Sequence, residues 1–385
     1  MREVYLDQAA SMLMIKPAID ALKDYYEKAW AGANANSLHS YGRKNAQAFE
    51  GARKQIAQAL GAHRPSEIIV TGGGTESDNF ALLGLAQAQR QKDKKRNKVI
   101  MSNFEHEAVS QSSLPLKALG FEVQEVQCDA YGFIQASALE EMLDEEVALV
   151  SIMLVNNELG TVQDVARLAK LAHAYGAKFH TDAVQGFCHV PFNAEESGVD
   201  AASVTAHKIG GPVGIGALYV RRGTAITPFL YGGGQEHGKR SGSLDVAGLL
   251  AFGAAAEYQS KHFEENYQKI SKTSKLIYER LLAHPDLFER TLTPVEGRQY
   301  HPGYVSIFCK TKLSSHVLLA LDEKGFYVSA GSACHASSTE GSHTLVAIGA
   351  SAKQMQSVMR ITFDERLSED DAQAFCDELI SLCQA

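Results

Sequence analysis

Short apolar, β-branched segments alternate with helical patterns along the first 220 residues. The segments predicted to be strands are EIIVTGG, KVIMSN, FEVQEV, ALVSIMLV, KFHTDA, AASVTA and IGALYV. They lie between about Pro17 and Tyr219. This alternation is typical of a mostly parallel sheet that helices cover on both faces. We therefore expect an α/β fold with a seven-stranded central sheet flanked by helices.

The pattern changes in the second part of the chain. A segment uninterrupted by proline predicts a long helical stretch from about Val246 to Leu282 that connects the two parts. After it come the strand GYVSIF, the helix SSHVLLALDEKG, the strand FYVSAG, a helix, the strand VMRITF and a last helix, which suits a smaller α+β domain. A chain of 385 residues also favours two domains. We expect a large domain of residues 14–258 and a small domain of residues 1–13 and 259–385.

Charge and apolar content limit the classes of partner. The formal net charge of -8 gives no broad basic surface for nucleic acid or for an anionic membrane. The basic stretch KDKKRNK, from Lys92 to Lys98, is predicted to be a solvated loop, with docking of an acidic partner as the less favoured alternative. No apolar run has membrane-spanning length, and the first residues lack the pattern of a secretory signal. We expect a cytoplasmic protein.

The six cysteines show none of the short pairs that thiolate metal sites use. We therefore expect no metal site and reduced thiols in a reducing compartment. The cysteines are Cys128, Cys188, Cys309, Cys334, Cys376 and Cys383.

Ligands of open parallel sheets bind beyond the carboxyl ends of the strands. After EIIV comes TGGGTESDN, in which three glycines precede Thr75 at the start of a predicted helix. Backbone N–H groups, a helix N-terminus and a hydroxyl can together bind a phosphate. A plain glycine turn before a helix explains the same segment equally well.

Other polar residues follow the neighbouring strands. Each alone has an ordinary structural explanation, such as a core histidine, a helix cap or a solvated lysine. Together they supply an imidazole above a ring, a carboxylate for a ring nitrogen, a hydrogen-bond donor and an amine for a Schiff base, which pyridoxal phosphate requires. The glycines after the lysine are expected to leave room for the planar cofactor. The residues are His106, Asn156, Asn157, Asp182, Gln185 and Lys208.

In this order the motifs resemble those of the cysteine desulfurase family, a class-V aminotransferase-like group of fold-type I pyridoxal phosphate enzymes. The resemblance spans nearly the whole chain. It rests on YLDQAA, NSLHSYGRKN, TGGGTESDN, NFEHEAV, VNNELGTVQD, HTDAVQG, TAHKIGGPVGIGALYV, GGGQEHGKRSG, SAGSACHASS and VMRITF. It implies a homodimer that converts L-cysteine to L-alanine. The sulfur would pass, as a persulfide, to an iron-sulfur scaffold or a tRNA-thiolation enzyme.

The resemblance also implies a role for individual residues at the cofactor. Lys208 would form the Schiff base and move the α-proton, Asp182 would pair with the pyridine nitrogen, and His106 would stack on the ring. Gln185 would reach the phenolic oxygen. The phosphate would be bound by Gly74, Thr75, Thr205 and His207, and by Ser243 from the neighbouring subunit.

Substrate and sulfur are assigned in the same way. Arg360 would grip the substrate carboxylate, with Asn157 assisting it beside the cofactor. Cys334 would be the nucleophile, although a lone cysteine is more often a buried apolar thiol. Its segment, residues 330–342, is rich in small residues, and we expect a mobile loop that holds Cys334 at rest well away from Lys208.

Some positions depart from the usual family pattern without removing a reacting group. They leave the sulfur acceptor open. Separately, the sequence leaves alternatives to the desulfurase. These alternatives are a selenocysteine lyase, another fold-type I aminotransferase or lyase, and a non-catalytic sulfur-relay partner. The departing positions are Ala35, Val213, His237, Ser243, Asp245 and Gly341.

Overall fold

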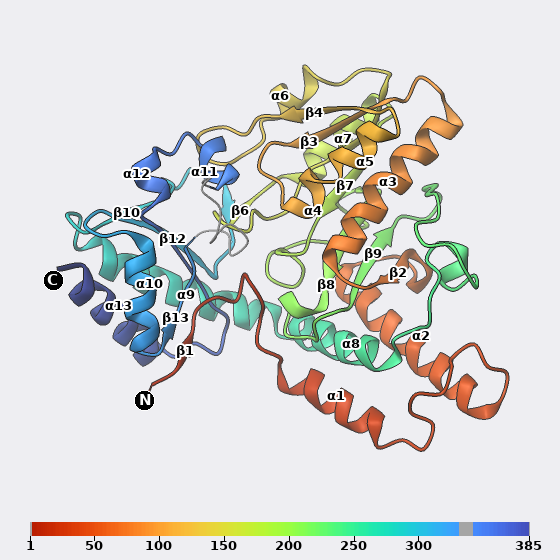
Figure 1. The fold of residues 1–385 in the computed structure, drawn as a ribbon, viewed down its shortest axis with the longest axis horizontal. Coiled ribbons are helices and arrows are strands. Elements are labelled where there is room, and N and C mark those ends of the chain that lie inside the picture. Colours follow the sequence, from red (N-terminus) through yellow and green to blue (C-terminus); the bar gives the residue numbers. More distant parts are fainter. Residues whose placement is uncertain (1, 331–341, 385) are drawn as a thin grey trace.

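The computed structural model describes residues 2–330 and 342–384, and a seven-stranded sheet is its centre (Figure 1). The strand order is β2-β9-β8-β7-β5-β3-β4. Strand β9 runs antiparallel to β2 and β8, and the remaining neighbours are parallel. The mostly parallel sheet predicted from the sequence is therefore confirmed. The strands are β2 (Ile68–Thr71), β3 (Lys98–Ser102), β4 (Glu122–Val126), β5 (Val147–Ser151), β7 (Lys178–Asp182), β8 (Ala201–Thr205) and β9 (Gly216–Val220).

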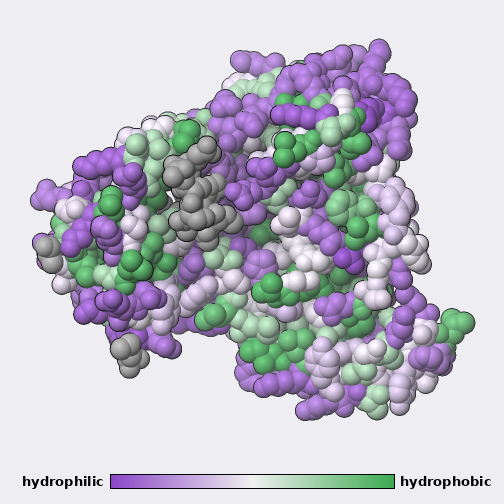
Figure 2. All heavy atoms as spheres, in the orientation of Figure 1, coloured by the Kyte–Doolittle hydropathy of each residue, from purple (hydrophilic) through white to green (hydrophobic). Residues whose placement is uncertain are grey.

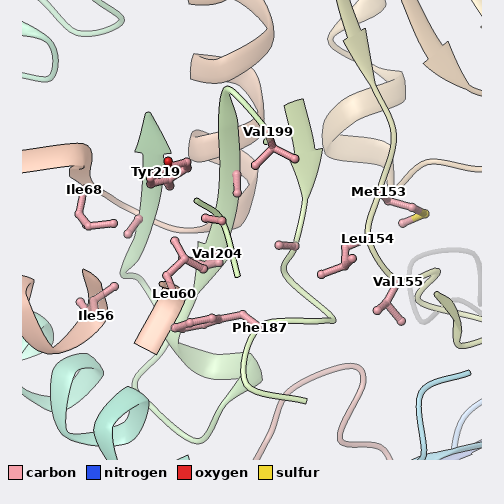
Figure 3. Close-up of a cluster of buried hydrophobic side chains, with 14 of the residues drawn as sticks. Ile56, Leu60, Ile68, Met153, Leu154, Val155, Phe187, Val199, Val204 and Tyr219 are labelled. Atoms are coloured by element: carbon pink, nitrogen blue, oxygen red, sulfur yellow. The ribbon is translucent and has the colours of Figure 1, made fainter. Parts of the chain in front are cut away.

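Helices cover both faces of this sheet. Because side chains alternate between the faces of a strand, Ile68 and Val70 of β2 join one hydrophobic cluster and Ile69 joins another. The first cluster includes Ile56 and Leu60 of α2, which lie near Ile68 in Figure 3. The helices are α1 (Lys16–Tyr26), α2 (Ser40–Leu60), α3 (Gly74–Lys92), α4 (Glu107–Ser110), α5 (Ser113–Ala118), α6 (Ala136–Glu140), α7 (Val165–Ala174) and α8 (Val246–Lys261), with 3-10 turns η1 (Pro65–Glu67), η2 (Ala206–Lys208) and η3 (Glu236–Gly238).

A second core lies around a small antiparallel sheet of order β10-β12-β14. Its buried side chains include Phe288, Val305, Ile361 and Phe375. The two chain ends lie on this side of the molecule (Figure 1). The elements are α9 (Phe263–Leu282), β10 (Phe288–Arg290), β12 (Tyr304–Cys309), α10 (Ser314–Glu323), β13 (Phe326–Tyr327), α11 (His343–Ala347), α12 (Ala352–Met355), β14 (Val358–Thr362) and α13 (Glu369–Gln384).

Two pairs of very short strands connect distant parts of the chain. Strand β1 (Val4–Tyr5) pairs in parallel with β13, and β6 (Thr161–Val162) pairs with β11 (Gln299–Tyr300). The first pair attaches the N-terminal segment to the second core. We propose the division into residues 14–258 and residues 1–13 with 259–385, which the two separate cores support.

The predicted helical stretch from Val246 to Leu282 is interrupted at one residue, because α8 ends at Lys261 and α9 begins at Phe263. Between them, His262 has φ -104° and ψ 11°, and its Nδ1 lies 2.8 Å from the carbonyl oxygen of Tyr258. The break lets α8 pack in the first core and α9 in the second.

Hydrophilic residues cover most of the upper part of the face in Figure 2. Within the described residues, no helix combines the length and the apolar character that a membrane crossing needs.

Candidate active site

A pocket of about 300 Å³ lies where the strands of the large sheet end. Its lining comes from the segments after β2, β3, β5, β7 and β8, together with the N-terminal segment and two residues of the second core. The pocket is lined by predicted residues that lie far apart in the sequence. Those that line it are Gly74, Thr75, His106, Asn157, Asp182, Gln185, Thr205, His207, Lys208 and Arg360.

Two of the predicted residues that the structure describes, Asn156 and Ser243, do not line the pocket. Asn156 is buried, and its Oδ1 accepts from the N–H groups of Glu158 and Leu159 at 2.9 Å. Ser243 is exposed in the segment before α8, so the pocket of its own chain does not include it. Cys334 and its loop lie outside the described residues. Their predicted roles and the predicted mobility therefore stay predictions.

Lys208 ends the 3-10 turn η2, directly beyond β8. Its Nζ donates a hydrogen bond to the carbonyl oxygen of Ala10 at 2.9 Å and another to that of Ala9. Backbone acceptors therefore hold the amine in the pocket.

The glycines that follow Lys208 have a different purpose from the one expected. Gly210 has φ +80°, and a Cβ there would come within 2.6 Å of Ile15. A Cβ on Gly211 would come within 2.8 Å of the Cβ of Ala206. The glycines thus let the N-terminal segment and η2 pack closely, and neither of these two glycines lines the pocket.

Asp182, at the end of β7, places a buried carboxylate in the pocket. Its Oδ1 accepts a hydrogen bond from the backbone N–H of Val184 at 2.9 Å. Burial raises the pKa of Asp182, and the nearby His106 and Lys208 oppose the rise. A carboxylate in this environment can pair with the protonated nitrogen of an aromatic ring.

A second buried acid, Asp78, was missed by the sequence analysis. It lies on α3, one turn after Gly74, and this helical spacing was the available signal. Burial, with the neighbouring Asp182 charge adding to it, holds the pKa of Asp78 well above its ordinary value. Nearby His180 bridges Ser151 at 2.9 Å and Ser203 at 3.0 Å, and burial lowers its pKa to about 3, so its ring is neutral.

The start of α3 and the turn after β8 form the end of the pocket that suits a phosphate. A Cβ on Gly74 would lie 2.9 Å from Cγ2 of Val184, so the backbone approaches its neighbour closely here. Thr205 Oγ1 lies 3.1 Å from Nδ1 of His207. Burial and the charge of Lys208 lower the pKa of His207 to about 4. The imidazole of His207 is therefore neutral at pH 7 and can contribute a hydrogen bond without a charge.

His106 and Gln185 are held by contacts of their own. His106 caps α4, with its Nδ1 accepting from the N–H of Ala108 at 3.1 Å. Gln185 donates to the carbonyl oxygen of Ala9 at 3.0 Å and accepts from the hydroxyl of Tyr304 at 2.8 Å. Gln185 thus joins the N-terminal segment to β12, a function that the sequence did not indicate.

Arg360 enters the pocket from β14 of the second core. Its Nη1 donates to the backbone carbonyl of Asn157 at 2.8 Å, and its Nη2 donates to Asp7 at 2.9 Å. Asn157 therefore assists the arginine through its backbone.

Two further lining residues were not predicted, because only the fold brings them here. Glu158 Oε2 accepts from the hydroxyl of Ser342 at 2.6 Å. His343, at the start of α11, has its Nε2 2.7 Å from the carbonyl oxygen of Glu105. These contacts attach α11 to the strand ends of the large sheet.

Beneath this contact Glu105 is buried, and burial raises its pKa to about 8. Its Oε1 accepts from the hydroxyl of Ser102 and from the N–H of Met153 at 2.8 Å. Its Oε2 is buried without a hydrogen-bond partner among the described residues. The protonated carboxyl is therefore the stable form in the folded protein near neutral pH.

This raised pKa predicts a pH-dependent stability. Between pH 5 and 8 the folded state keeps a proton on Glu105 that the unfolded state has lost. The contribution of Glu105 to the free energy of unfolding should then fall as the pH rises, by about 1.4 kcal/mol per pH unit. Urea unfolding at pH 5, 6.5 and 8 should show a smaller decline for Glu105→Gln, which cannot titrate. The exposed Glu122→Gln is the control, and parallel curves for Glu105→Gln and wild type would contradict the protonated state.

Burial or a neighbouring thiol raises the pKa of four described cysteines, whereas the contact with Cys309 lowers the pKa of Cys383. Cys128, Cys188, Cys309, Cys376 and Cys383 are free, and none lines the pocket. Burial raises the pKa of Cys128 to about 11 and that of Cys376 to about 12. In the described ranges, no group of three or more metal-ligating side chains is arranged to hold a metal ion.

Comparison with known proteins identifies the family. Residues 4–375 match the class-V aminotransferase family. Cysteine desulfurase IscS of Dictyoglomus turgidum is 37% identical over 98% of this chain and 94% of its own length. The chain belongs to the cysteine desulfurase family. This membership confirms the resemblance seen in the sequence.

Solved structures agree with this assignment. A NifS-like protein is 30% identical, with a TM-score of 0.90 and complete coverage of both chains. The structure described as SspA in complex with cysteine is 32% identical, with a TM-score of 0.78, and the match covers 94% of this chain and 98% of that one. The fold-type I architecture of this desulfurase-family chain is thereby confirmed.

Proposed function

We propose that this protein uses pyridoxal 5'-phosphate to convert L-cysteine to L-alanine and transfers the sulfur to Cys334 as a persulfide. Its family makes it a cysteine desulfurase-type enzyme. The observation that carries the proposal is the meeting of Lys208, Asp182 and Arg360 in one pocket. They supply an amine for a Schiff base, a buried acid for a ring nitrogen and a cation for a carboxylate.

The pocket suits the cofactor chemically. An aldehyde needs an amine, and the Nζ of Lys208 lies among backbone carbonyls at the end of β8. Asp182 would hold the ring nitrogen in its protonated form, His106 would cover the ring, and Gln185 would lie near the phenolic oxygen. Gly74, Thr75, Thr205 and His207 would bind the phosphate through N–H and hydroxyl groups. When bound, pyridoxal phosphate would supply a conjugated ring that accepts the electron pair released at the substrate's α-carbon.

The remaining chemistry belongs to the side chains. Arg360 would bind the α-carboxylate, and the amine of Lys208 would move the α-proton. The thiolate of Cys334 would attack the substrate sulfur, so that the new S–S bond forms while the substrate C–S bond breaks. The products are alanine and a Cys334 persulfide, which balances the atoms of cysteine and one thiol. The relative SspA was solved in complex with cysteine, which favours the same amino acid here.

A homodimer is part of this proposal. Ser243 is exposed, and the same loop carries Tyr231, which is 82% exposed. The loop is closed on itself by a hydrogen bond from Ser241 to Leu230. An exposed aromatic ring in the loop that carries Ser243 suits a contact in which this loop reaches the phosphate of the neighbouring subunit. The persulfide would then pass to an iron-sulfur scaffold or a tRNA-thiolation enzyme in the cytoplasm.

The direct test is to incubate the purified, cofactor-loaded protein with L-cysteine and a thiol reductant and to measure alanine and sulfide. We expect both products in equal amounts. Alanine without sulfide would contradict the sulfur transfer, and neither product would favour the sulfur-relay alternative. A parallel assay with L-selenocysteine tests the lyase alternative, which requires turnover of selenocysteine alone.

A further inference from the structure

The guanidinium of Arg360 is held on two sides by groups that do not belong to the large sheet's strands. Nη2 donates to Oδ1 of Asp7 at 2.9 Å, and Nη1 donates to the carbonyl oxygen of Asn157 at 2.8 Å. The Arg360 side chain is 3% exposed and that of Asp7 is 21% exposed. The Nε of Arg360 is buried and has no hydrogen-bond partner among the described residues. Asp7 and the Asn157 carbonyl are thus the acceptors that fix this side chain.

Asp7 is itself held rigidly. The N–H of Thr362 donates to the carbonyl of Leu6 at 2.8 Å, and the N–H of Gln8 donates to the carbonyl of Thr362 at 3.1 Å. The N–H of Ala9 donates to the hydroxyl of Thr362 at 2.9 Å. The backbone on both sides of Asp7 is therefore attached to β14, two residues beyond Arg360. Asp7 does not line the pocket, so it can act on a ligand only through the arginine.

We propose that Asp7 is a positioning residue for substrate recognition, whose carboxylate fixes the guanidinium of Arg360 in the orientation that receives the substrate's α-carboxylate. This inference rests on the proposed function of Arg360. An arginine side chain loses about 2 kcal/mol of rotamer entropy when it becomes fixed. A two-point pairing with a carboxylate requires the guanidinium plane to be fixed. A guanidinium already held by a rigid backbone loses that freedom before the substrate arrives.

Asp7 also has a second effect, which lowers the affinity for the substrate. Its negative charge reduces the attraction between Arg360 and an incoming carboxylate. If this masking were dominant, removal of Asp7 would tighten the binding of the substrate. We infer that positioning dominates, because Arg360 without Asp7 would keep a single protein acceptor for a buried cation.

The experiment titrates the cofactor-loaded protein with L-alanine and with ethylamine and follows the cofactor absorbance. Ethylamine is alanine without its carboxylate, so it measures everything except the contact to Arg360. Asp7→Ala should weaken the binding of L-alanine about tenfold or more, because one charge-assisted hydrogen bond that holds Arg360 is lost. The affinity for ethylamine should stay unchanged. Asp7→Asn keeps an acceptor oxygen and should lose less. Asp20→Ala, which removes an exposed ion pair with Lys16 on α1, is the matched control and should change neither ligand.

Arg360→Lys separates this inference from the proposed function. Lysine lacks the planar fork, so this variant should also lose L-alanine affinity while keeping its cofactor. Adding Asp7→Ala to Arg360→Lys should then produce no further loss. Unchanged alanine binding by Arg360→Lys would refute the role of Arg360, and the inference about Asp7 with it.

If Arg360→Lys weakens alanine, unchanged or tighter binding by Asp7→Ala would overturn the positioning role alone. An equal loss of alanine and ethylamine would also overturn it, because such a loss indicates general damage to the pocket. If Asp7→Ala does not fold, the affinities of Asp7→Asn and wild type for L-alanine and ethylamine test the positioning role instead.

Discussion

Replacing Lys208 with alanine is expected to remove the visible absorbance of the cofactor and all release of alanine from L-cysteine. The amine of Lys208 lies in the pocket, where the carbonyl of Ala10 accepts from it at 2.9 Å. No other lysine lines the described pocket. On the proposed function, the substitution removes both the group that would attach the aldehyde and the base that would move the α-proton.

The measurement is the absorption spectrum of protein purified with added pyridoxal phosphate, followed by the alanine assay. Lys98→Ala is a matched control, because Lys98 is a half-buried lysine at the start of β3 that lies outside the pocket. That variant should keep its colour and its activity. A coloured, active Lys208→Ala protein would remove the central residue from the proposed site.

Replacing Cys334 with serine is expected to separate cofactor chemistry from sulfur transfer. The variant should bind pyridoxal phosphate and still change its absorbance when L-cysteine is added. It should release alanine only at the background level, because a hydroxyl is a poor acceptor for sulfur. Mass spectrometry after incubation with L-cysteine should find the added sulfur on the wild-type Cys334 peptide and none on the variant.

Cys128→Ser provides the control for the loss of a thiol. Burial raises the pKa of the Cys128 thiol to about 11, so it is a weak nucleophile near neutral pH. This variant should keep the wild-type rate. Undiminished alanine release by Cys334→Ser would show instead that Cys334 is a structural residue.

The sequence alone predicted the strands of the large sheet and most of the pocket residues named here, for one physical reason. Apolar periodicity located the buried strands, and the carboxyl ends of parallel strands share one edge of a sheet. Residues as distant as Thr75 and Lys208 could therefore be placed together. Lys208 lines the pocket as expected, whereas Gly210 was misinterpreted, because its close neighbour Ile15 comes from a different segment.

What the sequence could not provide depends on contacts between remote segments. Asp7 meets Arg360 across 353 positions, and Ser342 meets Glu158 across 184. No periodicity links such pairs, so neither the support of Arg360 nor the attachment of α11 was predicted. The break at His262 was missed because no proline or glycine marks it, although the helices change there from one core to the other.

The attachment of the N-terminal segment to β14 also determines when the site can be completed during synthesis. Asp7 is synthesised long before Thr362, whose N–H donates to the neighbouring Leu6 carbonyl. Contacts between such distant positions form slowly and only after the intervening chain has been made. Arg360 and the acceptor that fixes it can therefore meet only after the whole stretch between them has been made. A chain released before Arg360 has been made lacks this pair even where the large sheet has formed.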